Sequence, residues 1–157
     1  MISRPRPGLK NGLQPEAGTY IIVLKVKTAR NIEIGKIGQF KFKKGYYFYT
    51  GSAHGPGGIK ARIERHIKRN KPEHWHIDYL RSASSIVAIL VGYSKMKKEC
   101  VWASKLRSSP SFTIPVNGFG SSDCLCVSHL FFSEINYNID IFIESLKDSV
   151  EYIKISS

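Results

Sequence analysis

Basic side chains recur at helical spacing just after a glycine-rich segment, between residues 55 and 69. At ~100° per residue, four of them share one arc of a helix: Arg62, Arg65, His66 and Arg69. The preceding run GPGG at 55–58 cannot continue a strand, so it predicts a turn that opens the helix with free backbone N–H groups. Arginine forks beside such a helix start are suited to a phosphate group. We therefore expect an anion-binding site here, against the alternative of a solvated basic face.

The segments around this turn indicate how the site is held. Residues 46–52 are rich in Tyr and Phe and predict a strand in which Tyr47 and Tyr49 share one face. After the turn, three isoleucines recur every four residues: Ile59, Ile63 and Ile67. We predict a helix over residues 59–69 that packs these isoleucines on a sheet, with the basic arc beside them.

The bulk composition is that of a single soluble globular domain. A chain of 157 residues with 42% hydrophobic and 23% charged residues is long enough to bury a proper core. Even the apolar run at 86–91 is too short to span a membrane, and no apolar segment follows the basic N-terminus as in a secretory signal. The three cysteines are sparse and odd in number, which fits a reducing compartment. We expect a cytoplasmic protein with no membrane partner.

The positive charge is large and unevenly distributed. The formal net charge is +12, and residues 1–107 hold 22 Lys and Arg against 6 Asp and Glu. Residues 108–157 hold 2 against 6, so a basic body is followed by a mildly acidic tail. Such a body predicts a polyanionic partner, and DNA is the first candidate. The alternative is charge that serves solubility alone.

Hydrophobic periodicity predicts a fold of the α/β class (α+β type), a small antiparallel sheet flanked by helices. An irregular arm is expected over residues 1–17, where Pro and Gly are frequent. The predicted strands are 21–27, 31–35, 37–43, 46–52, 86–93 and 124–132. The predicted helices are 59–69, 74–82, 98–106 and part of an amphipathic tail from about residue 138, and residues 108–122 are expected to form a long loop.

Two histidine-containing segments invite a zinc interpretation that we do not favour. In HWHID at 74–78 the i, i+2 spacing does not place both histidines on one helix face, so we expect His74 or His76 to contact phosphate or handle a proton. In DCLCVSH at 123–129, a strand would turn Cys124 and Cys126 to one face and His129 to the other. Two soft ligands without a second pair do not make a zinc site, so we predict structural cysteines.

Several of these segments together resemble one family. Gly18-Thr19-Tyr20, Tyr49-Thr50-Gly51 and the helix residues Arg62 and His66 are similar to the motifs of the GIY-YIG nuclease superfamily. The chain resembles one small branch of this superfamily more closely. Members of that branch are sometimes fused to a base-excision repair glycosylase of the endonuclease III type. That likeness rests on YTGSA at 49–53, ARIERH at 61–66, HWHIDYL at 74–80 and GFGSSDCLCVSHL at 118–130. It covers residues 18–132, which we take as the nuclease-like domain, with 133–157 as a C-terminal extension packed on or beside it.

The resemblance implies metal-dependent hydrolysis of a DNA phosphodiester, with DNA repair as the setting. It implies catalytic roles for four residues: Tyr20, Tyr49, Arg62 and His66. The arginine would hold the scissile phosphate, the tyrosine hydroxyls would position or activate water, and the histidine would relay a proton. The residues expected to bind nucleic acid are Gly51, Ser52, Lys60, Arg65, Arg69, His74 and His76.

The expected cofactor is a single Mg²⁺ or Mn²⁺, which the superfamily holds with a glutamate on a later helix. Ser104 stands about where that glutamate would be, so we assign Glu99, about one and a half turns earlier, as the ligand. The alternative is that no metal carboxylate is present, and then the chain would be a non-catalytic nucleic-acid-binding module. A binder of small molecules or acidic proteins ranks last, since it leaves the motifs unexplained.

Overall fold

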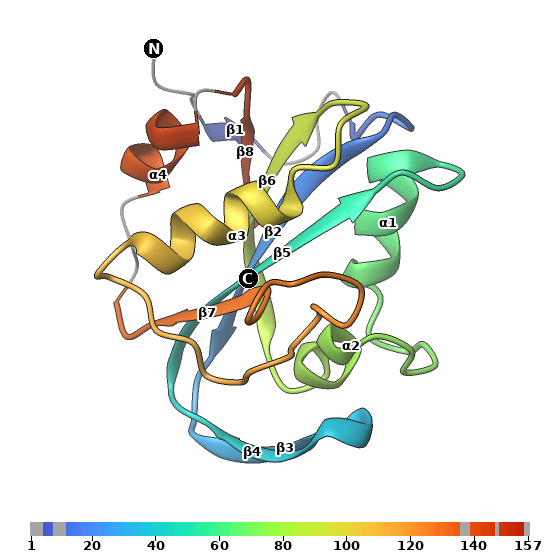
Figure 1. Cartoon of the computed structure of the whole chain (residues 1–157). Helices are drawn as coiled ribbons and strands as arrows, with labels where there is room; N and C mark the ends of the chain where they lie inside the picture. Colours follow the sequence, from blue (N-terminus) through green and yellow to red (C-terminus); the bar gives the residue numbers. More distant parts are fainter. Residues whose placement is uncertain (1–4, 8–11, 136–138, 147, 156–157) are drawn as a thin grey trace.

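The computed structural model describes residues 5–7, 12–135, 139–146 and 148–155 as an α+β fold, as predicted (Figure 1). Its sheet runs in the order β1-β8-β6-β2-β5-β7, with all neighbours antiparallel except β1 and β8, which are parallel. The strands are β1 (Pro5–Pro7), β2 (Gly18–Val26), β5 (Gly45–Ala53), β6 (Ser85–Tyr93), β7 (Leu130–Ser133) and β8 (Glu151–Lys154). The helices are α1 (Gly58–Ile67), α2 (His76–Arg81), α3 (Glu99–Ser108) and α4 (Ile139–Leu146).

The predicted hairpin forms a separate two-stranded sheet of β3 (Arg30–Ile34) and β4 (Gly38–Phe42), joined by a short 3-10 turn at Gly35–Ile37. β3 contacts α2, so the hairpin lies beside the second helix (Figure 1). No helix among the described residues is long and apolar enough to cross a membrane.

β2 lies at the centre of the sheet and is buried on both faces, because the run Tyr20–Leu24 is apolar without interruption. Tyr20, Ile22 and Leu24 belong to one core, which α1 and α2 close. Ile21 and Val23 point to the other face and pack in a second core that includes Trp102 of α3 and residues of α4. The sheet therefore separates two helical layers, and the predicted site lies on the α1 and α2 side.

Helix α1 begins after Gly57, whose φ of 82° is left-handed and suits glycine. Ile59 and Ile63 are wholly buried against the sheet, as predicted. The prediction is wrong for Ile67, whose side chain is 37% exposed, because the helix ends at this residue and Lys68 is extended. The expected helix over 59–69 is thus two residues too long, and Arg69 lies outside the arc assigned to it.

The two ends of the chain both reach the main sheet. Pro5–Pro7, expected to be irregular, pairs with Tyr152–Lys154, although most of the expected arm, residues 1–4 and 8–11, lies outside the described residues. β8 also pairs with β6, so the tail after residue 133 supplies a strand as well as the predicted helix.

The strand predicted over 124–132 is wrong in its first six residues. Regular pairing with β5 starts only at Leu130, and residues 118–129 form a loop that begins with left-handed Gly118 and Gly120. This loop is fastened by backbone hydrogen bonds from Gly118 N to Val127 O (2.7 Å) and from His129 N to Phe119 O (2.8 Å).

Candidate functional site

Two tyrosines are brought to one face of the sheet by the register of β2 with β5. Tyr20 lies opposite Gly51 and Ile22 opposite Tyr49, so the two tyrosine rings are diagonal neighbours with centroids 6.5 Å apart. Gly51 leaves the space that the Tyr20 ring fills, since a Cβ at this position would lie 2.4 Å from the Tyr20 hydroxyl oxygen. The glycine in the motif is therefore a steric requirement of Tyr20.

The Tyr20 hydroxyl forms a hydrogen bond with a histidine of α1. Its oxygen lies 2.9 Å from His66 Nε2, and the histidine is 1% exposed. Burial lowers the pKa of His66 to about 3, so its imidazole is neutral near pH 7. Burial also raises the pKa of Tyr20 to about 12, against an opposing effect of the Arg62 guanidinium, and raises the pKa of Tyr49 well above its usual range. Both hydroxyls are thus protonated in the free protein.

Arg62 is held in place by β5 and by the segment before α2. Its Nη1 donates to the Ser52 carbonyl at 2.9 Å, and its guanidinium carbon lies 4.6 Å from the centroid of the Trp75 ring. The side chain is half-buried, and it lines the cavity described next. A stacked, backbone-anchored guanidinium is oriented before any ligand arrives.

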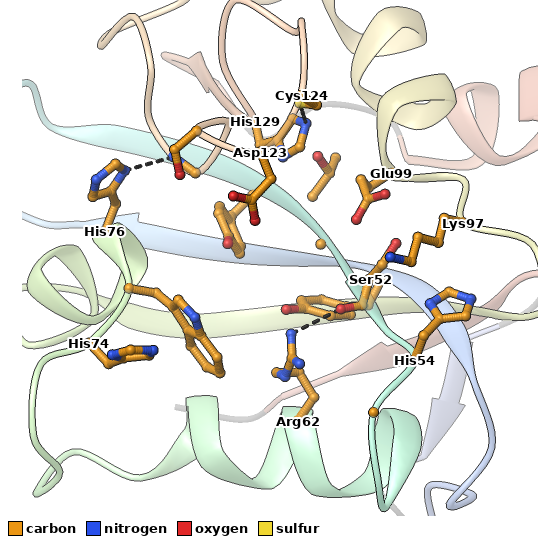
Figure 2. A pocket seen from close by; sticks show the side chains of 18 residues that line it. Ser52, His54, Arg62, His74, His76, Lys97, Glu99, Asp123, Cys124 and His129 are labelled. Atoms are coloured by element: carbon orange, nitrogen blue, oxygen red, sulfur yellow. Dashed lines mark hydrogen bonds between the residues drawn. The ribbon is translucent and has the colours of Figure 1, made fainter.

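A cavity of about 690 Å³ connects these side chains. Tyr20, Tyr49 and Arg62 line it, together with Glu99 from the first turn of α3 and Asp123 from the 118–129 loop. Figure 2 shows the Glu99 and Asp123 carboxylates entering from one side and the Arg62 guanidinium from the other. His66 does not line this cavity, because it lies behind the Tyr20 ring. The arrangement places carboxylate oxygens, a fixed cation and two phenols around one space.

Polar atoms without partners point to a polar occupant of this cavity. Among the described residues, the Ser52 hydroxyl, the Thr50 hydroxyl and both ring nitrogens of His54 are buried without a hydrogen bond, and all three residues line the cavity. A buried polar group without a partner is unfavourable by about 1–3 kcal/mol, so these atoms are suited to water or to an anionic ligand.

The residues predicted to bind nucleic acid divide into two groups. Gly51, Ser52, His74 and His76 line the cavity, and His76 Nδ1 accepts a hydrogen bond of 2.8 Å from the Gly120 backbone (Figure 2). Three others do not line it: Lys60 is exposed on α1, Arg65 is paired with Asp78, and Arg69 donates to the Ser84 carbonyl at 3.2 Å.

The pair of Arg65 and Asp78 is a structural contact. Both Arg65 terminal nitrogens bind the carboxylate, at 3.0 and 3.1 Å, and the Arg65 guanidinium stacks on Trp75 at 4.2 Å. Asp78 also accepts the backbone N–H groups of His74 and Trp75 at 2.8 and 2.9 Å. Burial alone would raise the pKa of Asp78, but these hydrogen bonds outweigh it and lower the pKa. The pair therefore fixes the HWHID segment against α1.

The sequence analysis missed three ionisable side chains that line the cavity: His54, Lys97 and Asp123. Asp123 carries a usable signal, because it is the sole acidic residue between Glu99 and Glu134 and stands inside the motif at 118–130. His54 and Lys97 carry no comparable signal, since their placement depends on how the strand ends fold back on the sheet.

Three thiols and one imidazole come together at the edge of the cavity, in a group we call the sulfur cluster: Cys100, Cys124, Cys126 and His129. Their ligand atoms all lie within 4.8 Å of one another, and His129 Nε2 is 3.4 Å from Cys124 Sγ and 3.8 Å from Cys100 Sγ. The expectation that His129 faces away from the cysteines is wrong, because it assumed a strand where the chain forms a loop. It is the only such group of three or more His, Cys, Asp or Glu among the described residues.

One family model covers most of the chain. It carries the description "Domain of unknown function DUF123" and matches residues 19–151. No curated protein and no solved structure matches the chain. The matched range contains both walls of the cavity and all four residues of the sulfur cluster.

Proposed function

The chain belongs to the DUF123 family, and we propose that it is a divalent-metal-dependent DNA endonuclease with a site like that of the GIY-YIG nucleases. The family description names no activity, so the proposal rests on the site. The observation that carries it is the convergence of Tyr20, Tyr49 and Arg62 with two carboxylates on one cavity. Phosphodiester hydrolysis needs this combination of a cation for the phosphoryl oxygens, groups that orient water, and oxygen ligands for a hard metal.

The charge distribution supports a polyanionic substrate. The net charge is +12, and Lys97 joins Arg62 at the cavity wall. Arg62 retains N–H groups beyond the one bound to the Ser52 carbonyl, so it is able to bind a phosphoryl oxygen without losing its anchor. The unpaired Ser52 hydroxyl and His54 nitrogens provide further partners for the backbone of a nucleic acid.

The burial of the tyrosines changes the roles expected from the resemblance. A phenol whose pKa is raised to about 12 is a weak source of base at neutral pH, and so is a histidine whose pKa is lowered to about 3. We therefore assign the Tyr20 and Tyr49 hydroxyls to orienting water and phosphate. His66 is a positioning residue, because it acts on the substrate only through the hydroxyl of Tyr20.

The donor set fits a hard divalent ion. Mg²⁺ and Mn²⁺ prefer oxygen ligands and are commonly held by one or two carboxylates with water and substrate phosphate, and Glu99 and Asp123 offer such a pair. When bound, the ion would neutralise charge on the phosphate and lower the pKa of a coordinated water. Glu99 is the predicted ligand, and Asp123 is its new companion.

A nicking assay on plain, branched and flapped duplex DNA tests this function, with Mg²⁺ or Mn²⁺ present or omitted. We expect metal-dependent nicking that falls about 100- to 1000-fold in Arg62→Ala, as when one group that stabilises transition-state charge is removed. Lys41→Ala is the matched control, because it removes one positive charge from an exposed position on β4. Equal nicking by both variants, or nicking without metal, would contradict the proposal.

One observation favours the alternative, a non-catalytic nucleic-acid-binding module of the same fold. The raised pKa values of both tyrosines keep their phenols protonated near neutral pH, so neither is available as a general base. This alternative predicts salt-dependent DNA binding, weakened in Arg62→Ala, with no nicking of any substrate under any metal condition.

A further inference from the structure

The sulfur cluster has the composition and spacing of a closed metal site. Tetrahedral zinc with bonds of about 2.3 Å to sulfur and 2.0–2.1 Å to nitrogen places neighbouring ligand atoms roughly 3.5–3.8 Å apart. The contacts of His129 Nε2 with Cys124 Sγ and Cys100 Sγ are 3.4 and 3.8 Å. We propose that the cluster is a structural Cys3His zinc site that fastens the 118–129 loop to the first turn of α3.

Packing alone does not account for the position of the cysteines. All three are half-buried, and none belongs to either hydrophobic core. All three are also free thiols, and a disulfide between any two would leave the third without a partner. Thiolates with one imidazole are a ligand set that selects zinc over Mg²⁺ or Mn²⁺.

Apart from the cluster, the tip of the loop is held by a local backbone hydrogen bond from Cys124 N to Ser121 O (3.3 Å). Leu125, between two of the ligands, is fully exposed, and Ser122 and Asp123 are exposed as well. The backbone hydrogen bonds described above anchor the base of the loop, at Gly118 and His129, rather than its tip. A metal bound to Cys100 as well as to the loop would join segments more than 20 residues apart and stabilise this conformation.

The site would also position the acidic wall of the cavity. Glu99 directly precedes the ligand Cys100, and Asp123 directly precedes the ligand Cys124. Fixing the two cysteines on one ion therefore fixes the backbone from which both carboxylates enter the cavity. This consequence rests on the proposed nuclease function, whereas the zinc site itself does not.

Zinc content measured on the purified full chain tests the site without any DNA. We expect about one zinc per chain in the wild type after gel filtration, and near zero in Cys126→Ser and His129→Ala. Leu125→Ser is the matched control, because it changes an exposed residue of the same loop that offers no ligand, and it should keep the full zinc content. Far-UV circular dichroism shows whether the ligand variants remain folded.

Cobalt titration of zinc-free wild type keeps the test independent of folding defects in variants. Co²⁺ bound by cysteines gives thiolate-to-metal charge-transfer absorption, which we expect to saturate at one equivalent and to disappear when zinc is added. Absence of this absorption, or wild-type zinc content in both ligand variants, would overturn the site. Nicking is then measured in the presence of Mg²⁺ for the zinc-loaded wild type and for the zinc-free protein. This comparison separates the two proposals. Nicking that needs both ions supports the positioning role, and absence of nicking by a zinc-loaded chain counts against the nuclease alone.

Discussion

Substituting alanine for Gly51 tests whether this glycine is needed to make room for the Tyr20 ring. The new Cβ would lie 2.4 Å from the tyrosine hydroxyl oxygen and 2.5 Å from the ring carbon that carries it. The backbone of Gly51 is not left-handed, so the substitution strains packing rather than φ. Restoring ordinary contact at ~3.5 Å requires Tyr20 to move by about 1 Å. Tyr20 is 1% exposed, so this movement disturbs the packing around its ring.

That movement breaks the bond between the Tyr20 hydroxyl and His66 Nε2, now 2.9 Å. Overpacking is unfavourable by about 1–3 kcal/mol, and a buried hydrogen bond left unmade adds about 1–3 kcal/mol. We therefore expect Gly51→Ala to lower the free energy of unfolding by about 2–6 kcal/mol, the sum of the two effects. Urea denaturation followed by circular dichroism measures this difference.

Gly55→Ala is the matched control, because its Cβ meets no atom within 4 Å. Its free energy of unfolding should stay within about 0.5 kcal/mol of the wild type. In a Tyr20→Phe background the hydrogen bond is already absent, so Gly51→Ala should be less damaging there by about 1 kcal/mol. A Gly51→Ala protein as stable as Gly55→Ala would refute the steric account of the motif glycine.

Three further predictions concern stability and are all measured by denaturation. Ile59→Ala should lower the free energy of unfolding by about 2–5 kcal/mol, whereas Ile67→Ala should change it far less, because only the first is wholly buried; equal losses would contradict the position of the α1 end. Asp78→Asn should destabilise by about 1.5–3 kcal/mol, since it leaves the stacked, partly exposed Arg65 without its carboxylate; a neutral result would mean that the pair is not formed in solution. The free energy of unfolding should fall as pH drops from ~6.5 toward about 3, because the unfolded chain then binds a proton at His66 that the folded chain excludes. The slope from this residue approaches about 1.4 kcal/mol per pH unit, and His66→Gln should flatten it relative to wild type.

Local patterns predicted the framework of the site well. The uninterrupted apolar run after Tyr20 indicated a central strand, and β2 is that strand. The change from period two to period four across GPGG located the turn before α1 and correctly predicted the burial of Ile59 and Ile63, though not of Ile67. These features depend on side-chain polarity within a few residues, which the sequence displays directly.

Local sequence patterns did not predict the features that depend on contacts between residues far apart in the sequence. The helical arc grouped Arg65 with Arg62, yet Asp78, 13 residues away, pairs with Arg65 and removes it from the cavity. The alternation in CLCVSHL was typical of a strand, yet it lies in a loop whose conformation brings His129 back to Cys124. Cys100 joins them from α3, so the fourth ligand becomes apparent only when the helix is packed on the sheet. The second carboxylate of the cavity, Asp123, lies in the same loop, but its signal was present in the sequence as the lone acidic residue of the motif at 118–130.

The two tryptophans lie in different environments, so the intrinsic fluorescence of this chain reports on the cavity. Trp75 lines the cavity and contacts two guanidiniums, with Arg62 at 4.6 Å and Arg65 at 4.2 Å from its ring centroid. Trp102 is fully buried on the opposite side of the sheet, where its indole N–H donates to Asp148 at 3.2 Å. A ligand that draws Arg62 away from the indole changes the emission of Trp75 while Trp102 remains an internal reference. A soluble quencher reaches the first ring and not the second, so occupancy of the cavity is readable from unlabelled protein.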